Sequence, residues 1–271
     1  MHTVNDMLAW LAYGRGDEPA LALVAAHPDD ETIGAGGRLK RLAAADFVCI
    51  TDGAPRNGGD AAATGFASRE AYAAARREEL AAALAIGGIA PDHVRYIKIV
   101  DQEASLNLVV LARVLAEIFR EARPDAVVTH PYEGGHPDHD ATALAVHAAC
   151  RLVALSGAAA PAVIEMTSYH ARDGALEAGA FLANGGGEAA TDVLNDDARA
   201  FKAALFDCYA TQRDVLGGFP IAVERFRVAP VYDFTRAPHA GKLYYENHDW
   251  GMDGARWRAL AGDALAELEL A

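Results

Sequence analysis

Two short runs of histidine and aspartate are the residues of this sequence best suited to chemistry. One is His27-Pro28-Asp29-Asp30-Glu31, and the other is His136-Pro137-Asp138-His139. Two imidazoles and a carboxylate can hold a divalent metal ion and leave positions open for water and substrate. The remaining acids and imidazole are then available for proton transfer. The two runs together therefore predict a metal-dependent catalytic site.

The spacing within each run favours a shared site. His27 and Asp30 are three residues apart, so both side chains can aim at one point. In the second run, one imidazole can bind the ion while the other faces the substrate, and Asp138 can fix an imidazole's tautomer and favour its protonated form. The alternatives are acids that stabilise a helix N-terminus, which fits Glu31 best, and a polar loop leading into an Asp-capped helix.

Each run follows an apolar stretch that is predicted to be a buried strand. Residues 21–26 and 126–130 lack polar–apolar alternation, as expected when a sheet is covered on both faces. Sites in open α/β sheets form beyond the carboxyl ends of such strands. We therefore expect both runs at one edge of a sheet.

Strands and helices are predicted to alternate over the first 170 residues. Further strands are expected at 47–51, 94–100 and 162–168, and helices at 3–13, 33–45, 68–86, 105–122 and 140–155, with a loop over 52–65. This order predicts a Rossmann-like three-layer α/β/α fold with a mostly parallel sheet and right-handed crossovers.

The pattern changes after residue 170. We expect a hairpin turn at Gly185–Gly187, a helix over 198–211, a loop over 217–220, strands or an extended segment over 231–247, and an amphipathic helix over 255–268. Because no linker or repeat divides the chain, we predict one domain over 1–271. It comprises a Rossmann-like core at about 20–170 and a C-terminal subregion of mixed strands and helices at about 171–271.

The glycines after the first predicted strand do not indicate a nucleotide cofactor. Gly34, Gly36 and Gly37 resemble a dinucleotide fingerprint, but Leu39 stands where its third glycine belongs and acids precede the glycines. We expect these glycines to let a helix pack close to the sheet.

The composition narrows the classes of molecule that the protein is expected to bind. The net charge of −14 over 271 residues argues against nucleic acid and anionic membrane surfaces. The uncharged apolar stretch 152–164 is too short to span a bilayer, and the N-terminus lacks the pattern of a signal peptide, so we expect no membrane insertion. Cys49, Cys150 and Cys208 are expected to be reduced thiols of a cytoplasmic protein. The sequence leaves open whether the chain forms a homo-oligomer.

The chain resembles the PIG-L/LmbE family of zinc-dependent N-acetylglucosaminyl deacetylases. Both runs match the family's two main motifs, and the resemblance extends over about residues 20–228. Weaker matches are Arg76-x-x-Glu79, Asp101, residues 202–212 and Glu224-x-Phe226. The resemblance implies a hydrolase that removes an N-acetyl or short acyl group from a small amino sugar or its conjugate.

The resemblance also assigns roles to the matching residues. His27, Asp30 and His139 would hold one Zn²⁺ per chain, with other divalent ions also possible. Asp29 would be the general base, and His136 the general acid or oxyanion stabiliser, oriented by Asp138. Arg76 and Asp101 match positions that contact the sugar in some members.

Two other functions stay open at this point. His27 and Asp29 with a distant histidine also fit the metal-binding triad of an Fe(II) oxygenase. The same fold can also serve a catalytically inactive sugar-binding protein. The tail after Asp233 carries no assignable motif. Its residues Tyr244, Tyr245, His248 and Trp250 would either line the substrate cleft or pack in the core or surface.

Overall fold

A seven-stranded sheet forms the centre of the protein. The structure is a computed structural model that describes residues 2–183 and 187–271. The strand order is β3-β2-β1-β4-β5-β9-β8. The bounds are β1 (Leu21–Ala25), β2 (Asp46–Pro55), β3 (Val94–Asp101), β4 (Ala126–Thr129), β5 (Ala162–Met166), β8 (Ala190–Val193) and β9 (Val223–Val228). The first five strands pair in parallel, and β9 and β8 extend the sheet in antiparallel pairing. The predicted mostly parallel α/β sheet is confirmed.

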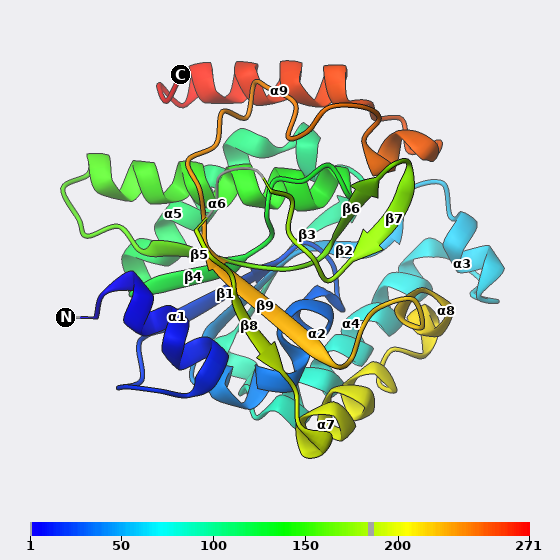
Figure 1. Ribbon diagram of the computed structural model, residues 1–271. Helices are drawn as coiled ribbons and strands as arrows, with labels where there is room; N and C mark the ends of the chain where they lie inside the picture. The colour runs from blue at the N-terminus through cyan, green and yellow to red at the C-terminus, as the bar shows by residue number, and fades with distance from the viewer. Residues whose placement is uncertain (1, 184–186) are drawn as a thin grey trace.

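Helices cover both faces of this sheet (Figure 1). Their bounds are α1 (Val4–Tyr13), α2 (Asp30–Ala35), α3 (Gly59–Ala63), α4 (Arg69–Gly87), α5 (Leu108–Ala122), α6 (Pro137–Leu155), α7 (Asp196–Phe206), α8 (Arg213–Leu216) and α9 (Gly254–Glu267). Side chains of a strand alternate between faces. Accordingly, Ala22 and Val24 of β1 pack with α5, α6 and α9, whereas Leu21 and Leu23 pack with α1, α4 and α7.

The helix expected at 33–45 is wrong in its bounds and partly in its type. It begins at Asp30, ends at Ala35 and continues as a 3₁₀ helix over Gly36–Leu42. The Gly37 N–H donates to the Glu224 carboxylate at 2.7 Å. A Cβ at Gly37 would overlap Leu194, and one at Gly34 would overlap Met166 of β5. These glycines therefore allow close packing, as expected.

The second motif lies inside a helix. The helix expected from residue 140 begins at Pro137, so Asp138 and His139 occupy its first turn. Proline suits that position because its missing N–H would have no helical partner.

The C-terminal subregion differs more from expectation. Residues 231–247, all within the described part, form no strand and only a 3₁₀ turn over Tyr244–Asn247. Tyr232 and Phe234 instead pack their rings on Tyr132, so aromatic side chains attach this segment to the domain without a strand joining the sheet. A hairpin does form between β6 (Tyr169–Arg172) and β7 (Ala175–Ala178). The turn expected at Gly185–Gly187 lies largely outside the described residues.

The topology creates a site between β1 and β4. The chain runs from β1 outward through β2 and β3, then returns to place β4 on the other side of β1. Segments leaving β1 and β4 therefore diverge at the carboxyl edge, which is where open α/β sheets bind ligands. Within the described residues, no helix has the length and apolar character needed to cross a bilayer.

Candidate active site

Three expected metal ligands converge at this edge. His27 and Asp30 come from the turn after β1, and His139 comes from α6 after β4. His27 Nδ1 lies 3.2 Å from Asp30 Oδ2 and 3.2 Å from His139 Nε2, and His139 Nε2 lies 3.1 Å from Asp30 Oδ1. All three side chains are buried. An ion at about 2.0–2.1 Å from tetrahedral donors separates those donors by about 3.3 Å. The spacing therefore fits one small divalent ion.

Neighbouring groups orient these ligands. His27 Nε2 lies 3.1 Å from Asp101 Oδ1, which favours a proton on Nε2 and leaves the Nδ1 lone pair facing the cluster. His139 Nδ1 contacts Ser168 Oγ at 3.2 Å. The His27 N–H donates to Asp30 Oδ2 at 2.7 Å. Such partners fix ring orientation and tautomer in metal sites. The donor set therefore fits Zn²⁺ or a similar ion.

A further histidine, His130, completes the packing of this cluster. It directly follows β4, its ring stacks on His139 at 4.1 Å, and its Nε2 accepts the Ala26 N–H at 3.0 Å. Because that nitrogen is occupied, His130 positions His139 and Asp30 rather than adding an obvious fourth ligand. Sequence reasoning treated His130 only as a strand residue. A histidine at the carboxyl end of a buried strand was the available signal.

Asp29, the expected base, pairs with a buried arginine. Arg76 Nη2 donates to Asp29 Oδ2 and to the Pro28 carbonyl, both at 3.0 Å. Asp29 has a φ of 153°, a sparsely populated conformation that costs about 1–3 kcal/mol and that functional sites often retain. Burial raises the pKa of the Asp29 carboxyl to about 8, although Arg76 opposes the shift. The Asp29 carboxylate therefore lies beside the ligand cluster and pairs with Arg76 instead of joining that cluster.

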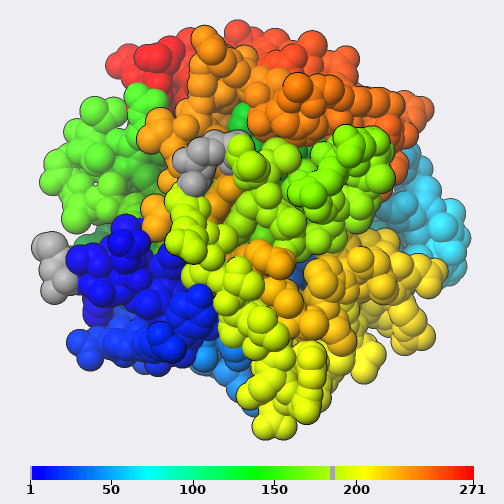
Figure 2. Space-filling view, viewed as in Figure 1, coloured from blue at the N-terminus to red at the C-terminus, as the bar shows by residue number. Residues whose placement is uncertain are grey.

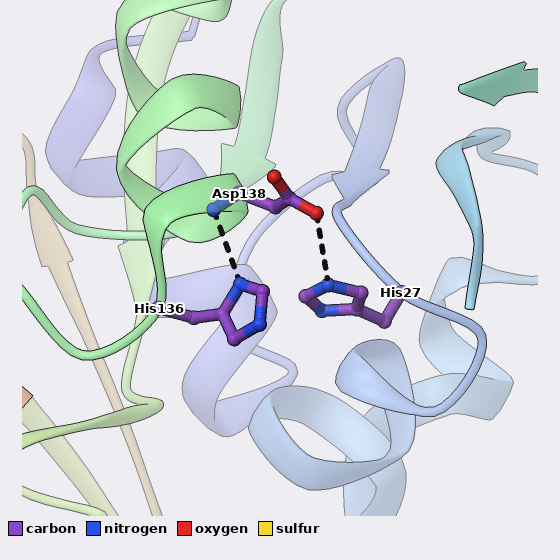
Figure 3. Close-up of side chains that lie close together, drawn as sticks. All are labelled: His27, His136 and Asp138. Atoms are coloured by element: carbon purple, nitrogen blue, oxygen red, sulfur yellow. Dashed lines mark hydrogen bonds and ion pairs between the residues drawn. The ribbon is translucent and has the colours of Figure 1, made fainter. Parts of the chain in front are cut away.

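The expected contact between the Asp138 carboxylate and His136 is absent. The Asp138 backbone N–H donates to His136 Nδ1 at 3.1 Å, while the carboxylate approaches His27 Nε2 at 3.4 Å (Figure 3). The cause is the helix start: His136 caps α6, so its ring faces the backbone of the first turn. Nδ1 is thus an acceptor, and the neutral ring carries its proton on Nε2. Burial and then the charge of His27 hold the pKa of His136 well below its usual range, opposite to the expected direction.

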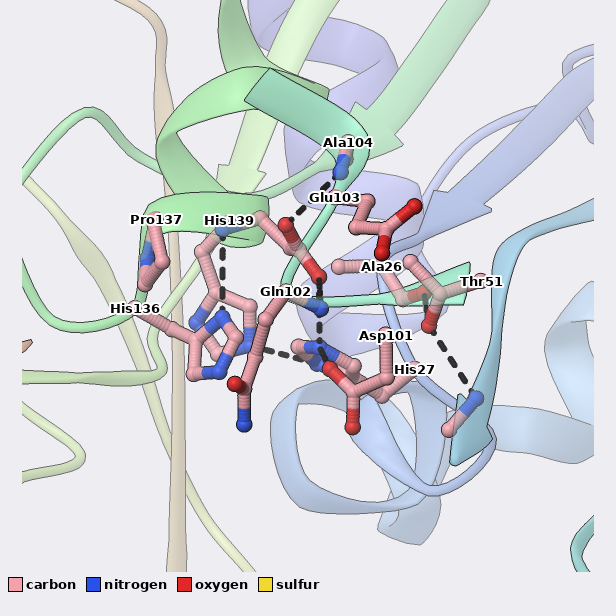
Figure 4. A network of polar contacts seen from close by, with 12 residues as sticks. Ala26, His27, Thr51, Asp101, Gln102, Glu103, Ala104, His136, Pro137 and His139 are labelled. Atoms are coloured by element: carbon pink, nitrogen blue, oxygen red, sulfur yellow. Dashed lines mark hydrogen bonds and ion pairs between the residues drawn. The ribbon is translucent and has the colours of Figure 1, made fainter. Parts of the chain in front are cut away.

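The Asp138 carboxylate instead holds the turn after β3. It accepts the N–H groups of Gln102 at 2.6 Å and Ala104 at 3.0 Å (Figure 4). This turn carries Asp101, which contacts His27. Asp138 therefore links the second motif to the first through the 101–104 backbone.

A cavity of about 290 Å³ opens beside these groups. Its lining includes every expected ligand and both Asp29 and His136, but not Asp138. Arg76 and Asp101 also line it, yet each is already engaged, Arg76 with Asp29 and Asp101 with His27. The sequence patterns did not identify the remaining residues that line the cavity: Ile33, Asp60, Gln102, Tyr169, Gln212, Val215 and Phe219. Among the tail aromatics, Trp250 lines the cavity whereas Tyr245 is buried in the core.

Two of the weaker sequence matches are structural. Lys202 Nζ contacts Glu224 Oε1 at 2.9 Å and donates to the Ile33 carbonyl at 2.7 Å, and both side chains are fully buried. This pair joins α7, β9 and the end of α2. It lies outside the cavity lining.

Comparisons with known proteins find similarity in the part of the chain that carries this site. The model of the family described as PIG-L, GlcNAc-PI de-N-acetylase, matches residues 22–150. A 1D-myo-inositol 2-acetamido-2-deoxy-alpha-D-glucopyranoside deacetylase 2 from Catenulispora acidiphila is 34% identical, covering 46% of this chain and 49% of that protein. A probable N-acetyl-alpha-D-glucosaminyl L-malate deacetylase 2 from Bacillus subtilis is also 34% identical, over 44% and 55%. The chain spans about half the length of these curated relatives.

Solved structures share the fold. The A40926 pseudoaglycone deacetylase Dbv21 aligns with a TM-score of 0.60 at 21% identity, covering 78% of this chain and 97% of its own. The 4-carboxy-2-hydroxymuconate hydratase GalB from Pseudomonas putida KT2440 also aligns, with a TM-score of 0.52 at 19% identity over 79% and 98%. The fold therefore does not fix the reaction by itself. The family match ends at residue 150 rather than near 228. Residues 22–150, which contain both motifs, match the model of the PIG-L family.

Proposed function

We propose that this chain is a metal-dependent hydrolase that removes the N-acetyl group from a conjugate of N-acetylglucosamine. The observation that carries the proposal is the convergence of His27, Asp30 and His139 beside Asp29 in one cavity. The family match and the deacetylase names of the relatives support the same reaction.

The metal ligands would be His27, Asp30 and His139. When bound there, Zn²⁺ or a similar ion would polarise the amide carbonyl and lower the pKa of an attacking water. Asp29 would accept the proton of that water on its carboxylate. Its burial and its bond to Arg76 hold this carboxylate in place for the transfer. A base that is already held beside the water does not have to be brought there by diffusion, which lowers the entropic cost of the transfer.

His136 would stabilise negative charge on the carbonyl oxygen. Its Nδ1 accepts the Asp138 N–H, so Nε2 presents a proton to the cavity that His136 lines. A neutral donor suits a developing oxyanion in a site shielded from water. Asp29, protonated in the first step, would then return its proton to the departing amine. The products are acetate and the free amino sugar.

The oxygenase alternative loses its geometric basis. It required the Asp29 carboxylate beside His27 at the metal, but the acid that converges there is Asp30, and Asp29 pairs with Arg76. A sugar-binding protein without turnover is the alternative that an activity assay separates from the proposal.

Acetate release from N-acetylated sugars tests the proposal. The zinc-loaded wild-type protein is incubated with N-acetylglucosamine and with its neutral conjugates, and acetate and free amine are both measured. We expect equal amounts of both products, and release slower by roughly 10²- to 10⁴-fold from an Asp29→Asn variant that retains zinc. A zinc-loaded wild-type protein that binds these sugars and releases no acetate would instead be a binding protein.

A further inference from the structure

The arginine that was expected to contact the sugar is occupied by the protein itself. Arg76 donates from Nη1 to the Gly53 carbonyl at 3.1 Å, and from Nη2 to the Pro28 carbonyl and to Asp29, both at 3.0 Å. Its Nε–H is buried and has no partner in the described part of the chain, so it cannot reach a ligand. Asp101 also gives one of its oxygens to a ligand histidine. The hydroxyl groups of a sugar therefore need other partners in the cavity.

The segment that follows α7 is tied to the site by side-chain hydrogen bonds. The Tyr209 hydroxyl donates to the buried Glu31 carboxylate of the first motif. Thr211 donates its N–H and its hydroxyl to Glu79 of α4, at 2.9 and 2.6 Å. Figure 2 shows the yellow surface of this segment beside the yellow-green β6–β7 hairpin, where aromatic rings of the two segments pack together. These bonds explain two of the weaker sequence matches and give the cavity a firmly held wall.

Gln212 holds a free acceptor in this wall. Its Nε2 donates to the Tyr72 hydroxyl at 2.6 Å and to the Thr211 carbonyl at 3.0 Å, which uses both hydrogens of the amide nitrogen. A flipped amide would set its oxygen against the Thr211 carbonyl oxygen, so these contacts fix the orientation. Oε1 accepts no hydrogen bond from any described residue, yet it is not enclosed by protein. Because Gln212 lines the cavity, Oε1 is available there to accept a hydrogen bond from a ligand.

Asp60 of α3 is a second free acceptor in the same cavity. Its carboxylate forms no hydrogen bond or ion pair with the residues that the structure describes, and it lines the cavity. The next residue, Ala61, is buried against Tyr72. Tyr72 thus supports both acceptors, since its ring packs on α3 and its hydroxyl holds the Gln212 amide. An ionised carboxylate and a carbonyl oxygen can only accept, so this wall selects ligand groups that donate.

We infer that Asp60 and Gln212 determine specificity by accepting hydrogen bonds from two hydroxyl groups of the amino sugar. The hydroxyl-bearing side of the sugar would lie against α3 and the segment after α7, while Arg76 stays with Asp29. This inference rests on the proposed function, which supplies the amino sugar. It makes Asp60 and Gln212 determinants of substrate binding and gives them no part in proton transfer.

Deoxy sugars test these contacts one hydroxyl at a time. Zinc-loaded Asp29→Asn protein is titrated with N-acetylglucosamine and with its 3-deoxy, 4-deoxy and 6-deoxy analogues. Binding is followed by saturation-transfer NMR, which does not depend on hydrolysis. We expect the loss of one hydroxyl to weaken binding about tenfold or more, because it leaves the charged Asp60 acceptor without its donor. The loss of another hydroxyl should weaken binding about two- to tenfold, because Gln212 is a neutral acceptor.

Two variants assign each hydroxyl to its acceptor. In the Asp29→Asn background, Asp60→Ala should bind N-acetylglucosamine and one deoxy analogue equally well, and Gln212→Met should do the same for a different analogue. In protein that retains Asp29, each change should raise KM and leave kcat within about twofold, because a contact made equally in the ground state and the transition state is lost. Asp92→Ala alters an exposed carboxylate in the turn before β3 and is the control that should keep every preference. Thermal unfolding of each variant checks that the fold is retained.

Three outcomes would overturn the inferred contacts: equal binding of the parent sugar and all three analogues, unchanged preferences in either variant, or no binding of N-acetylglucosamine at all. Acetate release at one efficiency from the parent sugar and every analogue would also overturn the contacts, but it would leave the proposed function standing. Binding that depends on the hydroxyl groups, without acetate release by the zinc-loaded wild type, would overturn the proposed function and leave the contacts standing.

Discussion

The carboxyl edge of the sheet and the packed region behind it bury similar polar side chains in opposite arrangements. At the edge, His27 Nδ1, His139 Nε2 and the Asp30 carboxylate oxygens face one another at 3.1–3.2 Å, and none of these atoms carries a proton in the form that binds a metal ion. Behind it, the Lys202 ammonium meets the Glu224 carboxylate and the Ile33 carbonyl, so donors match acceptors.

This difference distinguishes a ligand site from the scaffold around it. Buried polar groups are normally satisfied by hydrogen bonds. A matched pair such as Lys202 and Glu224 satisfies itself and needs no ligand. Lone pairs that face lone pairs need a cation to be stable. Both groups contain residues that match the family pattern. Only the arrangement at the edge, in which lone pairs face one another, predicts chemistry.

The largest expected effect is the loss of metal from the edge. His139→Ala removes one of three protein ligands and should largely abolish zinc binding and activity. The measurement is zinc content per chain after dialysis. The matched control is His147→Gln, which alters a histidine two turns further along α6 and should keep the metal. Full zinc occupancy in His139→Ala would disprove the ligand assignment.

Asp29→Asn should separate chemistry from metal binding. The amide keeps the size of the carboxylate but cannot accept a proton, so kcat should fall by roughly 10²- to 10⁴-fold while zinc content stays near one per chain. Parallel zinc analysis of Asp30→Asn gives the comparison. If Asp29→Asn lost zinc as completely as Asp30→Asn, the roles of base and ligand would be reversed.

Lys202→Met should damage the scaffold and spare the site. It leaves the Glu224 carboxylate buried without its partner, which should lower the free energy of unfolding by about 3–5 kcal/mol. Urea titration measures the loss. Adding Glu224→Gln should restore part of the stability because the neutral amide can still accept the Gly37 N–H. A loss of zinc without a loss of stability would show that this pair belongs to the site.

His136 should act as a neutral donor. His136→Ala should lower kcat by about 10²- to 10³-fold, the usual effect of removing an oxyanion donor. His136→Gln supplies an N–H in place of Nε2–H and should recover part of this rate. Because the ring acts in its neutral form, which keeps a proton on Nε2, titration of His136 should cause no decline in the wild-type rate as pH rises above 7. Equal rates for the Ala and Gln variants would remove the donor role.

How much of this could be predicted from the sequence depends on how local each feature is. The five parallel strands follow from short apolar or alternating runs, and the shared site follows from two compact motifs at strand ends. The division of roles among His27, Asp30 and His139 came from the resemblance to a family and stays a prediction. The contact of Asp138 could not be predicted, because it depends on whether α6 begins before or after that residue. The partners of Arg76 and the place of Trp250 required long-range packing that joins residues 29, 76 and 250. A spacing pattern carries no such information.

The smallest expected effect is a shift in pH dependence through Arg76. Burial raises the pKa of Asp29 to about 8, and the positive charge of Arg76 lowers it from a still higher value. The base acts when ionised, so kcat/KM should fall as pH drops through the pKa of Asp29. This fall is the acid limb of the pH profile. A cation bound in the loaded enzyme moves the acid limb to lower pH, because the cation favours the ionised carboxylate. Arg76→Met removes a buried positive charge and should move the limb to higher pH by about one unit. Arg77→Met is the control, since it removes an exposed arginine from the same helix and should leave the limb in place. An acid limb that stays fixed in Arg76→Met would mean that Asp29 is not the group that titrates.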